Sequence, residues 1–182
     1  MIIMGIDPGP EVSHYAICEK KERKPSFLKG GHFMNNSPSK NKNFIRDEKV
    51  DLLVIEMVKN YGMPMSDHVL ATCAASGAYA ALGNMLGICV RLVPRKTIVT
   101  ALCGSARAND ANVRSFLTDY WLSLFDLDGL GGGQNRLVGT SKDPGPFSGF
   151  RGKANSDKWA ALACATYELL GSEKVRDADE WL

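Results

Sequence analysis

Residues 2–9 read IIMGIDPG, an apolar run that ends abruptly at Asp7, Pro8 and Gly9. An apolar run of this length before an Asp-Pro-Gly sequence predicts a buried strand that ends in a tight turn. A second run, DLLVIE at residues 51–56, has the same pattern and also ends in an acid. Continuous apolar strands are typical of the centre of a parallel sheet that is covered on both faces, so these runs predict the middle of an α/β sheet.

The segments around these two runs alternate between strand-like and helix-like patterns. Apolar or alternating patterns bounded by turn residues predict three more strands, over Ser13–Cys18, Ser26–Phe33 and Ile88–Val93. The polar connection Asn35–Lys49 is expected to hold at most a short helix. Helical composition marks four segments, which are Ser66–Leu86, Arg95–Leu102, Asn109–Phe125 and Ser156–Leu170. This order predicts a mixed sheet, first antiparallel and then parallel, with helices on its faces.

The composition fits one globular domain. The chain has 182 residues, 45% of them hydrophobic and 23% charged, which is enough to bury a single core. We expect one domain over residues 1–182, with a polar tail from about residue 171 and a long glycine-rich loop over Asp126–Asn155. The formal net charge of +2 means that any basic surface for nucleic acid must be local.

Neither the cysteines nor the histidines show a ligand pattern. The five cysteines are scattered without a CxxC pair, which indicates small buried side chains in a reducing compartment. The histidines His14, His32 and His68 lack metal-ligand spacing and are interpreted as surface or structural residues. The sequence shows no secretory signal and no run long enough to cross a membrane, so we expect a cytoplasmic protein.

Three acidic residues lie where a strand ends or a helix begins. Asp7 ends the first strand and Glu56 ends the other buried one, so parallel neighbours would bring both carboxylates to the same edge of the sheet. Asp157 opens the last predicted helix, whose alanines allow close packing on the sheet. Clustered carboxylates repel one another unless protons or hard cations such as Mg²⁺ bridge them. The three acids therefore predict a metal site suited to phosphodiester hydrolysis.

Each acid also has a structural interpretation. Asp7 can simply form a turn with Pro8 and Gly9, and Asp157 can stabilise the positive end of its helix. A structural role is harder to find for Glu56, because a carboxylate after Leu-Leu-Val-Ile has little reason to lie at a buried strand end. A functional role is therefore favoured for this residue.

Four segments resemble, in order, the motifs of RuvC-like Holliday junction resolvases, especially those of their phage-encoded branch. They are GIDPGP with SHYAI (5–10 and 13–17), LLVIEMVKNYGMP (52–64), LCGSARANDANVR (102–114) and SDKWAALACA (156–165). The resemblance implies an RNase H-like α/β fold, with a mixed five-stranded sheet and helices on both faces. It also implies a homodimer that makes paired Mg²⁺-dependent cuts across four-way DNA, with Mn²⁺ as a substitute ion.

The resemblance implies a set of metal ligands. The carboxylates that match those of the family are Asp7, Glu56 and Asp157. The family often has a second aspartate in the last helix, where this chain has Ala160. Asp110 can supply the missing ligand, although either Asp110 or Asn109 can instead cap a helix.

Basic and aromatic residues near these motifs are candidates for DNA binding. Lys96 falls near a basic residue that similar proteins use beside the scissile phosphate, so it is also a catalytic candidate. Tyr61 lies where similar proteins present an aromatic ring to junction bases, with core packing as the alternative. The other candidates for phosphate contacts, each of which can instead be solvated surface, are Arg107, Arg114, Arg151, Lys153 and Lys158.

These residues lead to one functional hypothesis and three alternatives. We expect a Mg²⁺-dependent endonuclease for four-way or other branched DNA that dimerises through Ser66–Leu86, an alanine-rich segment that core packing also explains. The alternatives are a related nuclease for RNA–DNA hybrids, a nucleic-acid-binding protein of the same fold that does not cut, and an actin-like phosphotransferase. The last is disfavoured by length, because that fold usually requires two such domains with a nucleotide-binding glycine motif between them.

Overall fold

One five-stranded sheet with helices on both faces forms the protein. The computed structural model describes most of the chain, namely residues 1–59, 62, 64–125, 137–139, 145–150 and 156–171. The strands are β1 (Ile2–Asp7), β2 (Val12–Glu19), β3 (Ser26–Met34), β4 (Leu52–Met57) and β5 (Cys89–Pro94). The helices are α1 (Pro38–Asp47), α2 (Asp67–Met85), α3 (Arg95–Cys103), α4 (Asp110–Leu124), the short 3-10 helix η1 (Ser148–Phe150) and α6 (Ser156–Leu169). Within these described ranges, no helix has the length and apolarity needed to cross a membrane.

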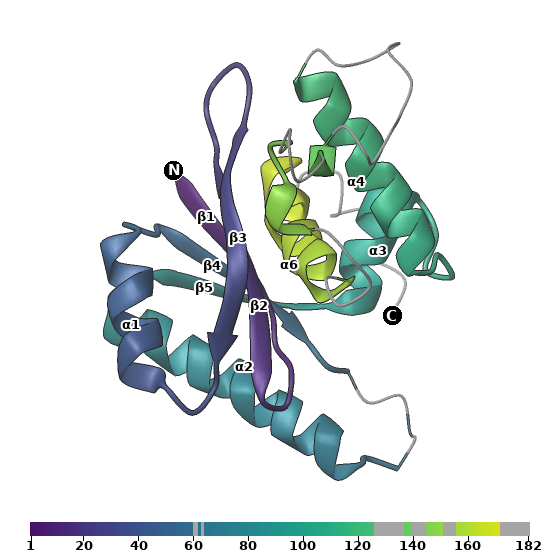
Figure 1. Ribbon diagram of the computed structural model, residues 1–182. Coiled ribbons are helices and arrows are strands. Elements are labelled where there is room, and N and C mark those ends of the chain that lie inside the picture. The colour runs from purple at the N-terminus through teal and green to yellow at the C-terminus, as the bar shows by residue number, and fades with distance from the viewer. Residues whose placement is uncertain (60–61, 63, 126–136, 140–144, 151–155, 172–182) are drawn as a thin grey trace.

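The two continuous apolar runs lie at the centre of the sheet, whose strand order is β3-β2-β1-β4-β5 (Figure 1). β1 pairs with β2 in antiparallel and with β4 in parallel orientation, and β4 pairs in parallel with β5. Ile6 lies opposite Ile55, so the next residues along the two strands, Asp7 and Glu56, are neighbours at the carboxyl edge. The prediction of a mixed sheet with its acidic strands side by side is confirmed.

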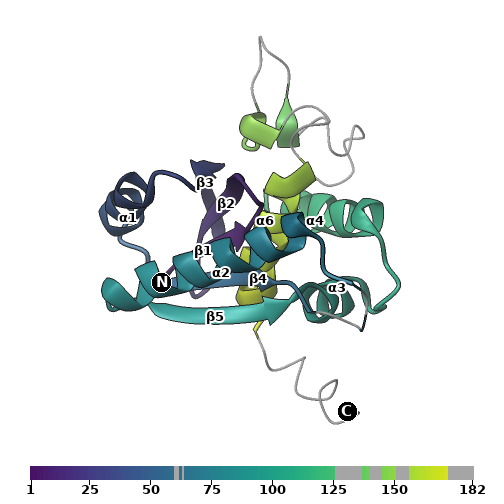
Figure 2. The same cartoon turned by 90° about the horizontal axis from the view of Figure 1, so that it is seen from below.

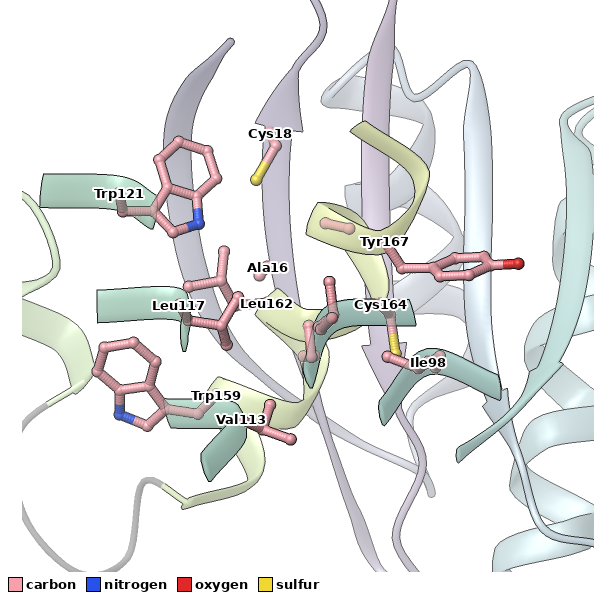
Figure 3. Packing of buried hydrophobic residues seen from close by; sticks show 14 of the residues in the cluster. Ala16, Cys18, Ile98, Val113, Leu117, Trp121, Trp159, Leu162, Cys164 and Tyr167 are labelled. Atoms are coloured by element: carbon pink, nitrogen blue, oxygen red, sulfur yellow. The ribbon is translucent and has the colours of Figure 1, made fainter. Parts of the chain in front are cut away.

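Alternate residues of the central strands enter two separate cores. Ile3 of β1 and Val54 of β4 belong to a buried cluster with α3, α4 and α6, whereas Met4 and Ile55 belong to a second cluster with α1 and α2. Figure 1 shows α3, α4 and α6 on one side of the sheet and α1 and α2 on the other. The rotated view in Figure 2 shows α2 running along β5. Figure 3 shows side chains of α4 and α6 packed together beside β2. By the same two-residue period, Asp7 and Glu56 project toward the face that α6 covers.

Helix α6 lies directly on β1. A Cβ atom built on Gly5 would be 2.1 Å from the carbonyl oxygen of Ala161 and 2.6 Å from the backbone nitrogen of Ala165. Both alanines are completely buried, and α6 also contacts β2 and β4. Small residues on the two sides allow this close approach, which brings the first turn of α6 to the carboxyl edge of β1.

The connection between β3 and β4 is more ordered than its polar composition predicts. It contains the ten-residue helix α1, which starts with Pro38 and buries Ile45 against the sheet. The side chain of Asn41 is buried and donates a hydrogen bond to the carbonyl oxygen of Met34, 2.9 Å away. A few buried contacts therefore fold a segment that was expected to hold at most a short helix.

The cysteines divide between the core and the surface. All five are free, and Cys18 and Cys164 are buried, as the sequence predicts. Cys73 and Cys103 are half-buried. Cys89 is exposed on β5, so for this residue the expectation of burial is wrong. The difference arises because β5 is an edge strand, most of whose residues remain accessible to solvent.

Candidate active site

Four carboxylates line one hollow at the carboxyl edge of the sheet, which we call the acidic pocket. Its acids come from four different elements and are Asp7 of β1, Glu56 of β4, Asp110 of α4 and Asp157 of α6. The rest of its lining consists of Arg95, Val113, Arg114, Trp159 and Ala160. The structure thus brings together the three acids found at strand and helix ends. It adds Asp110, the residue considered as a replacement for the family's second helix aspartate.

Capping of α4 leaves Asp110 available to the acidic pocket. The side chain of Asn109 accepts a hydrogen bond from the backbone nitrogen of Asn112 at 3.1 Å, and the side chain of Asn112 accepts one from the backbone nitrogen of Asn109 at 2.9 Å. This reciprocal capping box satisfies the helix start without Asp110. Of the two residues considered for the cap, Asn109 therefore fills that role, and Asp110 contacts Arg95 instead.

Arg95 places a positive charge between two of these acids. One of its terminal nitrogens, Nη1, donates to Oε1 and Oε2 of Glu56 at 3.3 and 3.1 Å, and the other, Nη2, donates to Oδ1 of Asp110. Arg95 begins α3 immediately after β5, the parallel neighbour of β4, and so lies at the same edge of the sheet. The sequence instead led to the next residue, Lys96, as the basic group of the site.

Lys96 lines a second hollow beside the acidic pocket, which we call the side pocket. Its lining consists of Glu56, Met57, Val58, Lys59, Arg95, Lys96, Val99, Ala106 and Ala108. Glu56 and Arg95 belong to both hollows, so the two are contiguous. The side pocket adds Lys59 and Lys96 to the positive charge of Arg95, whereas the acidic pocket is dominated by carboxylates.

Burial and like charges raise the pKa values of the two central carboxyl groups. For Asp7, desolvation is the largest cause, followed by the charges of Glu56 and Asp157, and its pKa is raised well above the ordinary value. Burial also raises the pKa of Glu56, and the neighbouring Arg95 opposes this effect. A cluster that is strained in this way gains free energy when a hard cation takes the place of the protons.

The donor set of the acidic pocket fits an oxygen-seeking divalent ion, because all four of its acids offer carboxylate oxygens. In the part of the chain that the structure describes, no three acidic, histidine or cysteine side chains are grouped closely enough to hold a metal ion. Arg95 binds two of the four carboxylates, which is the arrangement expected of repelling acids that have a guanidinium as their counter-ion.

His14 is a polar neighbour of the site that sequence reasoning interpreted as surface or structural. It lies opposite Asp7 in the β1–β2 pair, and its Nδ1 is 3.7 Å from Oδ2 of Asp157. Burial lowers the pKa of His14, although the charge of Asp157 opposes the shift. The sequence signal that could have placed His14 at the site is the register of the β1–β2 hairpin, since residues paired across an antiparallel turn share a face of the sheet.

The predicted DNA-binding residues are distributed around this edge. Arg114 lines the acidic pocket, and its Nε is buried without a hydrogen-bond partner among the described residues. Arg107 is exposed between α3 and α4, and Lys158 is half-buried next to Asp157. Three further candidates lie outside the described residues, and these are Tyr61, Arg151 and Lys153. Contacts with DNA remain predictions for all of them.

Comparisons with known proteins identify the fold. No family model and no curated protein matches the chain. Among solved structures, RuvC from Thermus thermophilus aligns with a TM-score of 0.64 and 14% identity, over 96% of this chain and 98% of that chain. A fowlpox virus resolvase in complex with Holliday junction DNA aligns with a TM-score of 0.55 and 10% identity, over 95% and 99% of the two chains. A yeast mitochondrial Holliday junction resolvase gives 0.55 and 10%, over 98% and 83%. The RuvC-like, RNase H-like fold is therefore confirmed.

Proposed function

We propose that this chain, which has the fold of RuvC, is a Mg²⁺-dependent, structure-selective endonuclease that cuts four-way or other branched DNA. The observation that carries the proposal is the acidic pocket, in which carboxylates from two parallel strands and two helices meet at the carboxyl edge of the sheet. Two structures with this fold, T. thermophilus RuvC and the fowlpox virus resolvase, are complexes with Holliday junction DNA. Fold and pocket chemistry therefore support the same substrate class.

The residues of the acidic pocket divide the chemical work among them. Asp7, Glu56 and Asp157 would hold the divalent ions, with Asp110 as a further oxygen donor. Bound Mg²⁺ makes a water molecule more acidic and stabilises negative charge on a phosphodiester, so no side chain has to act as the nucleophile. Asp7 and Glu56 are well suited to fix the position of the ions, because each follows a fully buried residue of its strand, Ile6 or Ile55.

Other groups of the acidic pocket would contact the DNA phosphate or limit the access of water to it. Arg114 can donate from its guanidinium group to the scissile phosphate, since this group matches the geometry of phosphate oxygens. Val113 and Trp159 are buried and form an apolar wall beside the carboxylates. Such a wall limits access of water and strengthens electrostatic interactions at the reacting phosphate.

A homodimer formed through α2 is the second part of the proposal. Leu70 and Met85 of this helix are 52% and 67% exposed, and Met65 just before it is 40% exposed. Large apolar side chains along one helix are commonly covered by a partner. A two-fold axis at α2 would present two acidic pockets to the strands of a roughly symmetric junction. Light scattering should detect a dimer in the wild type and a monomer in Leu70→Asp, and a monomeric wild type would refute this assembly.

Cleavage of a synthetic four-way DNA junction tests the enzymatic part of the proposal. We expect cuts in the presence of Mg²⁺ or Mn²⁺ and none with a chelator. Asp7→Asn and Glu56→Gln should still bind the junction in a gel-shift assay but lose strand scission, because each removes a charged ion ligand while leaving the fold intact. The matched control is Asp47→Asn on α1, an exposed acid paired with Arg46, which should cut like the wild type.

The same assay distinguishes the alternative functions. Junction binding without any nick would indicate a protein of this fold that no longer cuts, an outcome for which Ala160 in the acidic pocket is the motivating feature. Preferential cleavage of an RNA–DNA hybrid duplex over the junction would indicate a ribonuclease. Full activity of Asp7→Asn would show that the acidic pocket is not the catalytic site.

A further inference from the structure

Arg95 occupies the boundary between the acidic pocket and the side pocket. Its guanidinium group contacts Glu56 and Asp110 on one side, and it shares the lining of the side pocket with Lys59 and Lys96 on the other. The side chain is 42% exposed, so it has room to move between the two hollows. It is thus a partly exposed cation placed against two of the oxygen donors that a divalent ion would need.

A guanidinium group and a divalent ion compete for the same carboxylate oxygens. Without a counter-ion, the four acids of the acidic pocket repel one another, and Arg95 is the cation that contacts two of them directly. An incoming divalent ion would have to take Glu56 and Asp110 away from Arg95. The released guanidinium would then be free to turn to the side pocket, which Arg95 also lines, and there a DNA phosphate could accept its two parallel hydrogen bonds.

We propose that Arg95 is an internal counter-ion that a divalent ion displaces, and that the displaced side chain then binds a DNA phosphate at the side pocket. This step rests on the function proposed above. The proposal couples binding of the divalent ion to binding of DNA, because both favour the state in which Arg95 has left Glu56 and Asp110. By thermodynamic linkage, the ion must then strengthen DNA binding by the same factor by which DNA strengthens ion binding.

The solvent exposure of its ion pairs bears on whether Arg95 is a displaceable counter-ion or a purely structural residue. The Arg95–Asp110 pair has side-chain exposures of 42% and 72%, and ion pairs this accessible to water contribute little to stability. Arg91, on the preceding strand, shows the contrasting case, since it pairs at 2.6 Å with Glu168, whose side chain is only 8% exposed. Arg95 can therefore leave Asp110 at low cost. Its other partner, Glu56, has a side chain that is only 15% exposed, so Arg95 can leave Glu56 only if another cation takes its place there, as a divalent ion would.

Calorimetric titration of the metal-free, full-length protein with Mn²⁺ at pH 8, without DNA, provides the first test. Arg95→Gln should bind Mn²⁺ at least about tenfold more tightly than the wild type, because a competing charge has been removed from the ligands. Arg95→Lys should lie between the two, since lysine keeps the charge but cannot bridge both carboxylates. A variant sample that contained unfolded chains would bind Mn²⁺ more weakly, so misfolding of Arg95→Gln cannot imitate tighter binding.

Two matched variants control for loss of charge. Arg114→Gln removes a guanidinium from the same acidic pocket and should tighten Mn²⁺ binding much less than Arg95→Gln. Arg46→Gln removes one from an exposed pair with Asp47 on α1 and should leave binding unchanged. Equal gains for Arg114→Gln and Arg95→Gln would overturn the proposal, because they would reflect the total charge of the pocket rather than competition for ligands. Unchanged or weaker binding by Arg95→Gln would overturn it as well.

Fluorescence anisotropy with a labelled four-way junction tests the coupling. In the wild type, Ca²⁺ should increase junction affinity, whereas in Arg95→Gln most of this increase should disappear. An equal increase in both proteins would overturn the transfer of Arg95 to the phosphate. If the wild type binds no Mn²⁺ at all, the proposed function and this inference both fail. If it binds Mn²⁺ and cuts junctions while Arg95→Gln gains no affinity, the inference alone fails.

Discussion

Replacement of Gly5 by alanine should separate the two elements that form the acidic pocket. A Cβ at this position would lie 2.1 Å from the carbonyl oxygen of Ala161, whereas ordinary contact begins at 3.4 Å. The atoms in the way belong to the backbone of α6 and cannot rotate aside. The helix must therefore shift by about 1 Å, and overpacking of this kind costs about 3 kcal/mol or more of unfolding free energy. For a chain of this size, the melting temperature should fall by roughly 6–12 °C.

The same shift should also damage catalysis. Asp157 lies on the first turn of α6, so it would move away from Asp7, and a misplacement of about 1 Å can reduce activity by about 100-fold. Melting is followed by circular dichroism, and junction cleavage is measured well below the melting temperature. Asp47→Asn on α1 is the control, because it changes an exposed side chain and should melt and cut much like the wild type. Wild-type melting and cleavage in Gly5→Ala would refute the close packing of α6 on β1.

Two further predictions concern buried charges. Burial and the neighbouring carboxylates raise the pKa of Asp7 in the folded, metal-free protein, so the associated stability is present at acid pH and lost as the pH rises through that pKa. Asp7→Asn should therefore increase the melting temperature at pH 8, and this gain should shrink toward pH 4. A wild type whose metal-free stability does not fall, relative to Asp7→Asn, between pH 4 and pH 8 would contradict this. Arg91→Met should lower the unfolding free energy by about 1–3 kcal/mol, since it leaves the buried carboxylate of Glu168 without its cation, whereas Glu168→Gln should cost less than about 1 kcal/mol. Urea denaturation of both variants checks the asymmetry, and equal losses would argue against it.

The central part of the fold could be predicted because its signals are local and strong. IIMGID (2–7) and LLVIE (52–56) have no polar residue before their final acid, which is typical of strands covered on both faces. The intervening elements leave few ways to pair these strands. The convergence of Asp7 and Glu56 then follows from parallel neighbours that end at one edge. Helix α1 was underestimated, because a polar segment gives little indication that Phe44 and Ile45 will attach it to the core.

The parts of the site that sequence reasoning missed depend on the direction in which a side chain faces. Arg95 and Lys96 are adjacent at the start of α3, and successive residues of an α-helix point about 100° apart. One of them therefore faces the carboxylates while the other turns to the side pocket, and a motif that is located only to within a residue cannot distinguish them. His14 poses the same problem on a strand, since a shift of one residue in the hairpin would move it to the opposite face. The acids could be identified from the sequence because each one lies at the end of a strand or the start of a helix. An error of one residue in the predicted boundary does not change that assignment. The contacts of Arg95 and His14 depend on the direction of each side chain as well as on its position in the sequence. The contact of Arg95 with Glu56 and Asp110, from which we infer competition with a metal ion, is therefore visible only once the helices are placed on the sheet.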